Sequence, residues 1–272
     1  MRSIPTPFVA LLLTLVGPFV ALAADKPTPL VRAHAHNDYE HERPLLDALD
    51  HGFCSVEADI WYLDGEFRVG HDKADAIPGR TIEKLYLDPL LERTRANGGR
   101  VYPGGPEVIL LIDLKNDGAA CFTALHAVLE RDYAGMLTSF GPAGLEKRAV
   151  RAIISGDRPR AIMESLPVRY AAYDGRPDDL GGGASAEFIP LISESWAGLF
   201  KWHGKGEMPA AEATKLDDIV ARSHAEGRIV RFWAVAPRVE MWRVLFDAGV
   251  DLINTDDLDG LRDFLLAQGP RK

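Results

Sequence analysis

The residues best suited to chemistry are concentrated between Ala33 and Asp72, which read AHAHNDYEHERPLLDALDHGFCSVEADIWYLDGEFRVGHD. His34 and His36 alternate along one apolar segment, and Glu57 and Asp59 alternate along the next. Alternate side chains of a β-strand point to the same face. If both segments are strands, each pair therefore presents its functional groups together, and the pattern indicates a metal-assisted hydrolytic site.

A third histidine and a third carboxylate extend this site. His71 ends the stretch in FRVGHD, and Asp113 and Lys115 end a later apolar segment, VILLIDLK. Carboxylate oxygens suit Mg²⁺ or Ca²⁺ better than Zn²⁺. We therefore expect one divalent cation, Mg²⁺ or Ca²⁺, held by Asp113 together with Glu57 and Asp59. Two histidines on opposite sides of that ion would serve as base and acid, and Lys115 would hold a phosphate oxygen.

The elements that must position these groups follow from the spacing of apolar segments. Eight segments rich in β-branched residues predict strands at Leu30–His34, Phe53–Ile60, Val108–Leu114, Ala149–Ser155, Arg169–Tyr173, Phe188–Ser193, Ile229–Val235 and Asp251–Thr255. Helical patterns between them include Pro44–His51, Cys121–Glu130, Lys215–Glu226 and Arg238–Ala248. This alternation predicts an α/β protein, a single-domain (β/α)₈ TIM barrel, whose active site lies where the strands end. An open doubly wound sheet would carry a glycine-rich loop after its first strand, where this chain has histidines.

The first residues have the layout of a signal peptide. An early arginine and an apolar run precede Ala21-Leu22-Ala23, which predicts removal of residues 1–23 and a mature domain of residues 24–272. A membrane anchor is the alternative, but Pro18 interrupts the run and its length is at the short end for a span. We therefore expect an exported protein, periplasmic or secreted.

The net charge limits the classes of binding partner, and the two cysteines raise the question of a disulfide. The 272 residues carry 31 basic and 40 acidic side chains, a net charge of −9, which argues against nucleic acid and gives no attraction to anionic membranes beyond peripheral contact. The negative charge does not exclude a small-molecule or lipid phosphodiester as the partner, because a bound metal reverses the local field. We expect a monomer. Cys54 and Cys121 are the two cysteines, and a buried structural thiol is the expected role of Cys54, with pairing left open.

Taken together, the motifs resemble those of the phospholipase C-like phosphodiesterase superfamily, which includes glycerophosphodiester phosphodiesterases, bacterial phosphatidylinositol phospholipase C and sphingomyelinase D. The resemblance runs through AHAHND, SVEADIW, FRVGHD, LLIDLK, IVRFWAV and LINTDD, nearly the whole predicted mature chain. The combination of HAHNDY with RFWA and NTDDL looks most like the branch named for altered inheritance of mitochondria proteins.

The resemblance implies a role for each matching residue. His34 matches the first catalytic histidine and His71 the second, and the metal ligands match Glu57, Asp59 and Asp113. The implied activity is that of a phosphoric diester hydrolase acting on a glycerophosphodiester or phospholipid-type substrate, by direct hydrolysis or through a cyclic phosphate.

The substrate-binding residues follow in the same way. Lys115 matches a lysine beside the substrate phosphate, Asn37 a polar residue close to it, and Trp233 an aromatic residue of the pocket. His36 departs from the family pattern, because glycerophosphodiesterases usually carry arginine and glycine where this chain has Ala35 and His36. We expect His36 to support the first histidine, to contact phosphate or to replace the base.

Other readings of the substrate and of the function stay open. The aromatic residues Trp196, Phe200, Trp202 and Trp233 have two interpretations. They indicate either an apolar or ring-bearing alcohol group in the substrate, or packing at the rim of the barrel. A zinc amidohydrolase barrel also fits His-x-His, but it needs histidines ending the fifth and sixth strands, where the chain reads AAYD and LISES. A non-catalytic exported binding protein would predict an eroded site.

Overall fold

The computed structural model describes residues 27–269. The predicted signal peptide, residues 1–23, lies outside the described residues. Between residues 27 and 269, no helix has both the length and the apolar character needed to cross a lipid bilayer.

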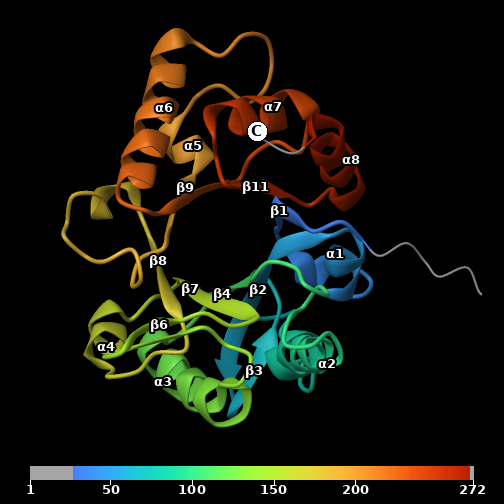
Figure 1. The fold of residues 1–272 in the computed structure, drawn as a ribbon, viewed down its shortest axis with the longest axis vertical. Helices are drawn as coiled ribbons and strands as arrows, with labels where there is room; N and C mark the ends of the chain where they lie inside the picture. The colour runs from blue at the N-terminus through green and yellow to red at the C-terminus, as the bar shows by residue number, and fades with distance from the viewer. Residues whose placement is uncertain (1–26, 270–272) are drawn as a thin grey trace, which may run out of the picture.

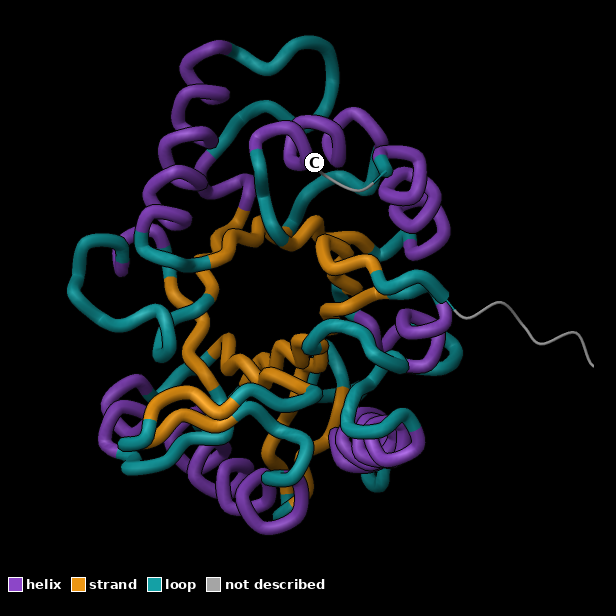
Figure 2. Tube along the Cα trace, in the orientation of Figure 1, coloured by secondary structure: helices purple, strands orange, loops and turns teal. Residues whose placement is uncertain are grey.

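Eight parallel strands close into a ring, and helices surround that ring on the outside (Figures 1 and 2). The strands follow one another in the order β1-β11-β10-β9-β8-β7-β4-β2, and β1 pairs with β2 to complete the circle. A short strand, β3 (Glu66–Val69), adds to β2 in the antiparallel direction. The predicted single-domain (β/α)₈ TIM barrel is thus confirmed.

The ring strands are β1 (Leu30–Ala35), β2 (Phe53–Leu63), β4 (Val108–Leu114), β7 (Val150–Gly156), β8 (Ala172–Gly175), β9 (Leu191–Ser195), β10 (Ile229–Trp233) and β11 (Leu252–Thr255). The α-helices are α1 (Leu46–Asp50), α2 (Asp88–Ala96), α3 (Gly118–Val128), α4 (Arg160–Ser165), α5 (Trp196–Leu199), α6 (Ala210–Ala225), α7 (Val239–Ala248) and α8 (Leu258–Gln268). Short 3₁₀ or π turns are η1 (Asp38–Glu40), η2 (Glu83–Leu87), η3 (Leu129–Tyr133) and η4 (Pro177–Asp179).

The predicted strands all exist, with ends displaced by at most three residues. The chain also forms a β-hairpin that the sequence patterns did not predict, β5 (Ser139–Gly141) with β6 (Gly144–Glu146). The hairpin lies on the segment between α3 and β7, so it is at the end of the barrel where the strands begin.

The interior of the barrel changes from apolar to polar along the strands. Where the strands begin, one apolar cluster joins Leu111, Ile153, Ala172, Leu191 and Leu252 with Phe140 of the hairpin. Two residues further along the same five strands stand the polar side chains of Asp113, Ser155, Asp174, Ser193 and Asn254. Because alternate residues of a strand share a face, these polar groups point into the same interior at its other end. The barrel is therefore closed by packing at one end and lined with polar groups at the other.

The opposite faces of the strands pack against the helices in a second, larger core. Cys54 lies in that core, as expected for a residue out of phase with Glu57, and both Cys54 and Cys121 are buried free thiols. Trp196, Phe200 and Trp202 also belong to this core, where Trp196 and Phe200 pack edge-on against Phe232. These aromatic rings are packing residues, so they give no information about the substrate.

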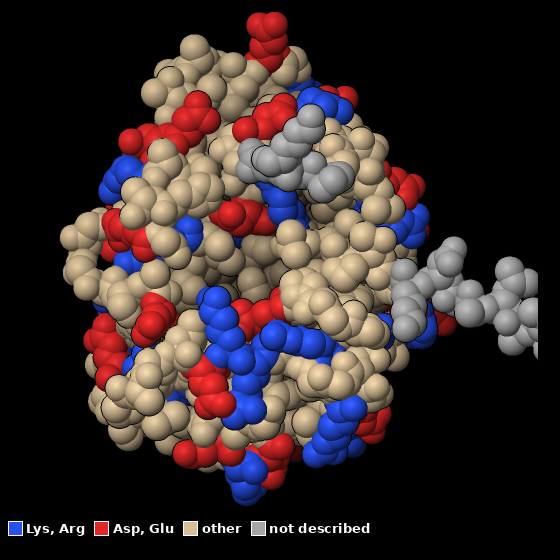
Figure 3. Space-filling view, in the orientation of Figure 1, with Lys and Arg blue, Asp and Glu red and all other residues tan. Residues whose placement is uncertain are grey.

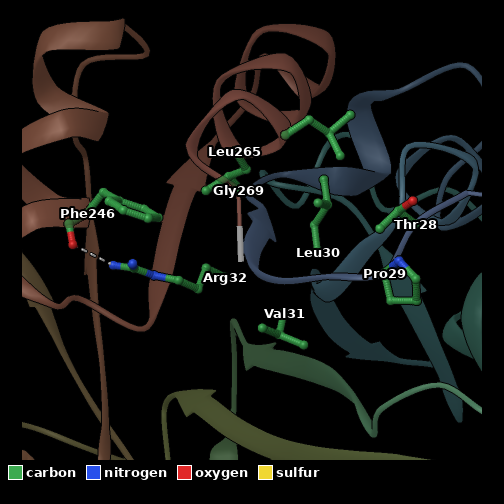
Figure 4. Close-up of a pocket in the computed structure, with 9 residues that line it drawn as sticks. Thr28, Pro29, Leu30, Val31, Arg32, Phe246, Leu265 and Gly269 are labelled. Carbon is green, nitrogen blue, oxygen red and sulfur yellow. Dashed lines mark hydrogen bonds between the residues drawn. The ribbon is translucent and has the colours of Figure 1, made fainter. Parts of the chain in front are cut away.

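Two surface features complete the description. On the face seen in Figure 3, acidic and basic side chains lie interspersed around a central hollow. A largely apolar cavity of about 590 Å³ lies where β1 begins, between Leu30, Phe246 of α7 and Leu265 of α8 (Figure 4). There Arg32 donates a hydrogen bond to the carbonyl of Phe246 at 3.0 Å. This cavity is separate from the strand ends that carry the predicted chemistry.

Candidate active site

The polar strand ends open onto one cavity of about 430 Å³. Its lining comprises His36, Asn37, Glu57, Asp59, His71, Asp113, Lys115, Ser155, Gly156, Arg176, Arg231, Trp233 and Ala234. Every site residue predicted from the sequence is in this set except His34. The structure therefore brings together side chains from strands far apart in the chain, as expected where the strands of a barrel end.

Three carboxylates form the centre of the cavity. Glu57 and Asp59 alternate on β2, and Asp113 on the neighbouring strand β4 is in register with Asp59. One oxygen from each of the three lies within 4.8 Å of the others. Gly156 of β7 makes room for the Asp113 carboxylate, because a Cβ at this position would collide with Oδ1 of Asp113 and the carbonyl of Leu114.

Crowding and burial perturb these carboxylates. Burial raises the pKa of Asp113 to about 6, with a further contribution from Asp59, although the nearby Lys115 ammonium opposes the rise. Burial and the Glu57 charge likewise raise the pKa of Asp59. Lys115 Nζ lies 2.7 Å from Asp59 Oδ2 and 3.3 Å from Asp113 Oδ1. Hard oxygen donors that repel one another at this spacing fit a divalent cation, which would relieve that repulsion.

Glu57 has a cationic partner of its own. Arg231 of β10 is 1% exposed, and its Nη2 donates a hydrogen bond to Glu57 Oε2 at 2.8 Å. Its Nε donates to Asn254 Oδ1 at 2.8 Å. Burial would raise the pKa of Glu57, but the Arg231 charge together with the neighbouring His34 and His36 outweighs burial and holds the pKa of that carboxyl well below its usual range. Glu57 is therefore ionised in the folded protein.

His34 lies behind Glu57 instead of on the cavity wall. It is fully buried, its Nδ1 is hydrogen-bonded to Ser55 Oγ at 2.7 Å, and its Nε2 lies 3.7 Å from Glu57 Oε2. Burial, reinforced by the charge of Arg231, lowers the pKa of His34 to about 3. His34 is thus a neutral side chain that supports Glu57.

His36 is half-buried and lines the cavity that His34 does not reach. Its Nδ1 lies 2.7 Å from Asp256 Oδ1 and its Nε2 lies 3.8 Å from Glu57 Oε2. Burial alone would lower the pKa of His36, but the hydrogen bond to Asp256 and the Glu57 charge outweigh it, so the pKa is raised. A carboxylate that fixes one imidazole nitrogen leaves the other oriented for proton transfer.

His71 stands on the other side of the carboxylates. The side chain is exposed, and its Nδ1 lies 3.2 Å from Asp59 Oδ2 and 3.1 Å from the hydroxyl of Tyr39. That hydroxyl also lies 2.7 Å from Asp59 Oδ2 and 2.7 Å from Asn37 Oδ1. Its single proton can serve one partner at a time, so Tyr39 links the backbone turn at Asn37 to the histidine and the carboxylate.

The far wall of the cavity is also polar. Arg176, just after β8, donates through Nη1 to Asp174 Oδ2 at 2.8 Å and to Ser193 Oγ at 2.9 Å. Asp174 is fully buried and also accepts a hydrogen bond from Ser155 Oγ at 2.7 Å. Trp233 is the aromatic side chain on the cavity wall, as the sequence resemblance implied.

Several residues of this site were not predicted from the sequence. Arg231 precedes Trp233 by two residues, so strand periodicity alone assigns both side chains to the inner face of the barrel. A basic residue inside an apolar strand was the signal that could have identified Arg231 as a site residue. Asp256 is the exception, because it directly follows the last strand and that position alone marks it as a candidate site residue. No local pattern indicated Tyr39 or Arg176.

Comparison with solved structures supports the class of fold. A glycerophosphodiester phosphodiesterase from Parabacteroides distasonis superposes with a TM-score of 0.54 at 16% identity, over 89% of this chain and 100% of the other. A putative glycerophosphoryl diester phosphodiesterase from Silicibacter pomeroyi gives a TM-score of 0.51 at 17% identity, over 89% and 95%. This chain thus shares the barrel fold of these solved structures.

The particular family is defined by the sequence. The family model of the AIM6-like phosphodiesterase domain matches residues 26–174, more than half of the chain, and that of the glycerophosphoryl diester phosphodiesterase family matches residues 230–259. The chain belongs to the AIM6-like phosphodiesterase domain family.

Named relatives agree with this assignment. Altered inheritance of mitochondria protein 6 from Eremothecium gossypii is 28% identical, over 89% of this chain and 71% of the relative. The homolog from Arthroderma benhamiae is 26% identical over 86% and 83%, and the protein from Saccharomyces cerevisiae is 29% identical over 83% and 68%.

Proposed function

We propose that this protein is a metal-dependent phosphoric diester hydrolase in which His36 and His71 act as the acid–base pair. The observation that carries the proposal is the position of these two histidines on either side of one carboxylate cluster. His36 lies 3.8 Å from Glu57, and His71 lies 3.2 Å from Asp59. Glu57, Asp59 and Asp113 would hold Mg²⁺ or Ca²⁺, which when bound neutralises charge on the phosphoryl oxygens.

The protein's own groups carry the remaining steps. Lys115 would contact a non-bridging phosphoryl oxygen, and Asn37 and Trp233 would position the substrate. An oxygen of water, or of a neighbouring substrate hydroxyl, forms the new bond to phosphorus and gives its proton to one histidine. The bond from phosphorus to the leaving alcohol breaks, its electron pair stays on the alcohol oxygen, and the other histidine protonates that oxygen. Asp256 orients His36 for its part in this exchange.

The test measures turnover of bis(p-nitrophenyl) phosphate with Mg²⁺ or Ca²⁺ and with a chelator. We expect the ion to be required, and His36→Ala and His71→Ala each to lower kcat by about 10²- to 10⁴-fold, the range for one acid–base group. His34→Gln should lose less, because its side chain does not reach the cavity. His224→Ala is the control, since His224 pairs with Asp251 on the surface.

Ion-independent turnover, or full activity in both cavity variants, would refute the proposal. The zinc alternative is not favoured, because the fifth and sixth ring strands, β8 and β9, end in Asp174-Gly175 and Glu194-Ser195 without the histidines it needs. A non-catalytic binding role is not favoured either, since the cavity keeps its full set of polar residues.

The natural substrate and the location of the protein belong to the same proposal. We infer a glycerophosphodiester or a phospholipid-type diester, cleaved by a monomer exported after removal of residues 1–23. Product release from glycerophosphodiesters, phosphatidylinositol, lysophospholipids and sphingomyelin would distinguish the substrates. Cell fractionation with N-terminal sequencing of the purified protein tests export, and an intact Met1 in the mature protein would contradict it.

A further inference from the structure

A fixed guanidinium lies on the floor of the candidate active site. Arg231 lines the cavity although the residue is only 1% exposed. Two of its nitrogens are held in place, Nη2 by Glu57 Oε2 at 2.8 Å and Nε by Asn254 Oδ1 at 2.8 Å. A guanidinium is a rigid planar fork, so two fixed corners determine the position of the third.

The third corner, Nη1, has no acceptor among residues 27–269. The buried side-chain atoms that lack a partner among residues 27–269 do not include this nitrogen, so it faces the cavity and is not enclosed by protein. Here the unpaired nitrogen belongs to a side chain on the cavity wall, so the cavity is where its acceptor must come from. A ligand bound in the cavity is therefore within reach of a free donor that the protein itself does not satisfy.

The position of Arg231 in the barrel indicates what it meets. Lys115 follows β4, and Arg231 lies on β10, four strands away in either direction around the ring of eight. Lys115 pairs with Asp59 and Asp113, and Arg231 pairs with Glu57. A group bound over the three carboxylates thus has one fixed cation on each side of it.

We propose that Arg231 Nη1 donates a hydrogen bond to a non-bridging phosphoryl oxygen of the substrate, opposite Lys115. This inference rests on the proposed phosphodiesterase activity and adds a substrate-contacting residue to it. As the new bond to phosphorus forms and the bond to the leaving alcohol breaks, charge on the non-bridging oxygens shifts toward the two cations. Arg231 transfers no proton, because arginine stays protonated, and the two histidines carry the protons as above.

A purely structural role explains less of this arrangement. A buried ion pair adds little stability over an apolar pair of the same volume. Holding Glu57 would also require only one of the three corners. A planar guanidinium with two nitrogens hydrogen-bonded to the protein and the third facing the cavity is instead suited to recognise a phosphoryl group.

The experiment compares wild type with Arg231→Met, Arg231→Gln and Arg231→Lys, and uses Arg228→Met as the matched control. Arg228 is also buried, at 3% exposed, but its partners are the carbonyls of Ile189 and Ala184 and the carboxylate of Glu226, away from the cavity. Turnover is measured with bis(p-nitrophenyl) phosphate. Ion binding is measured separately, by thermal stabilisation of each variant during titration with Mg²⁺ or Mn²⁺.

We expect Arg231→Met and Arg231→Gln to lower kcat/KM by about 10²- to 10³-fold, the usual loss for one transition-state donor. The ion titration midpoint should stay within about twofold of wild type, and Arg231→Lys should keep part of the activity because it keeps the charge. A midpoint shifted about tenfold or more, with activity restored by excess ion, would overturn the inference, because Arg231 would then act only by positioning Glu57.

Binding of inorganic phosphate separates this inference from the proposed activity. Calorimetry in the presence of Mg²⁺ should show phosphate binding at least about tenfold weaker in Arg231→Met than in wild type. If wild type binds phosphate through Arg231 but cleaves no diester, the proposed hydrolase activity is refuted and the proposed contact between Arg231 and phosphate is supported. Equal phosphate affinity in wild type, Arg231→Met and Arg231→Gln would overturn the contact. Asn254→Ala, which frees one anchored corner, gives a milder variant in case both substitutions unfold the protein.

Discussion

His34 and His36 show that two side chains on one strand face can have different surroundings. Alternation places both on the inner face of the first strand, but the two residues differ by about 7 Å along it. That distance moves His34 under Glu57, where it is fully buried, and leaves His36 at the cavity beside Asp256. Sequence periodicity identifies the face and not the depth, so the family match to His34 could not reveal which imidazole reaches the cavity.

The Asp256 carboxylate provides a test of His36 at this scale. Asp256→Asn keeps an oxygen for His36 Nδ1 but removes the charge that holds the ring in one tautomer. We expect kcat to fall by about 10- to 100-fold with little change in KM. Steady-state kinetics on bis(p-nitrophenyl) phosphate measures both constants.

A matched surface pair serves as the control for that substitution. Asp251 lies 2.8 Å from His224 Nε2, away from the cavity, so Asp251→Asn should leave kcat within about twofold of wild type. An equal loss in both variants would show that the effect is a general loss of folded protein and not a change at His36.

At the scale of elements, the connection after β1 holds the site from one side. It runs through η1 and carries Asn37 and Tyr39 to the carboxylates, and its backbone is strained at Leu45, whose φ is +64°. Asp38 anchors it, because the fully buried carboxylate accepts a hydrogen bond from the Leu45 amide. Asp38 is thus a buried polar anchor of this connection, in addition to the hydrogen bond from the Tyr39 hydroxyl to Asp59.

That anchor predicts a pH dependence of stability. Burial raises the pKa of Asp38 to about 7, so the folded state binds a proton that the unfolded chain releases above pH 4. The contribution of Asp38 to stability is therefore complete below about pH 4 and is lost as pH rises through about 7. Asp38→Asn should flatten this decline and be more stable than wild type at pH 8.

Urea unfolding at pH 5 and pH 8 measures the effect. Asp50→Asn, at an exposed helix position, is the control and should keep the wild-type pH dependence. If Asp38→Asn declines between the two pH values as steeply as wild type, Asp38 does not titrate as described.

The strands were predictable because each is a short β-branched segment between turn signals, and the ring then follows from their number and alternation with helices. The helices were less predictable from the sequence. α2 is too polar for a clear apolar face, and α8 contains Gly260 within its first turn. The β5–β6 hairpin depends on contacts distant in sequence, such as the Phe140 and Arg169 backbone pair, which no local pattern shows.

For the molecule as a whole, the hairpin closes one end of the barrel through Phe140. Phe140 is 2% exposed, and its side chain packs against residues from strands all round the barrel interior, including Leu111, Leu191 and Leu252. Phe140→Ala should lower the free energy of unfolding by about 3 to 5 kcal/mol, because it opens a cavity that the rigid strands cannot fill.

Urea denaturation measures this loss. Leu266→Ala is the control, since Leu266 is 51% exposed and should cost about 0.5 kcal/mol or less. A loss near that of the control would show that the hairpin lies over the barrel without supporting it.

The closure of the ring has a consequence for how the chain is made. The first strand pairs with β2 on one side and with β11, the last strand, on the other. During synthesis β1 emerges first and has no second neighbour until Leu252–Thr255 has been translated. The barrel therefore cannot close before β11 has been translated, and until then its half-built sheet keeps open edges that can pair with other strands. Closure of the ring is thus a late step that waits for β11.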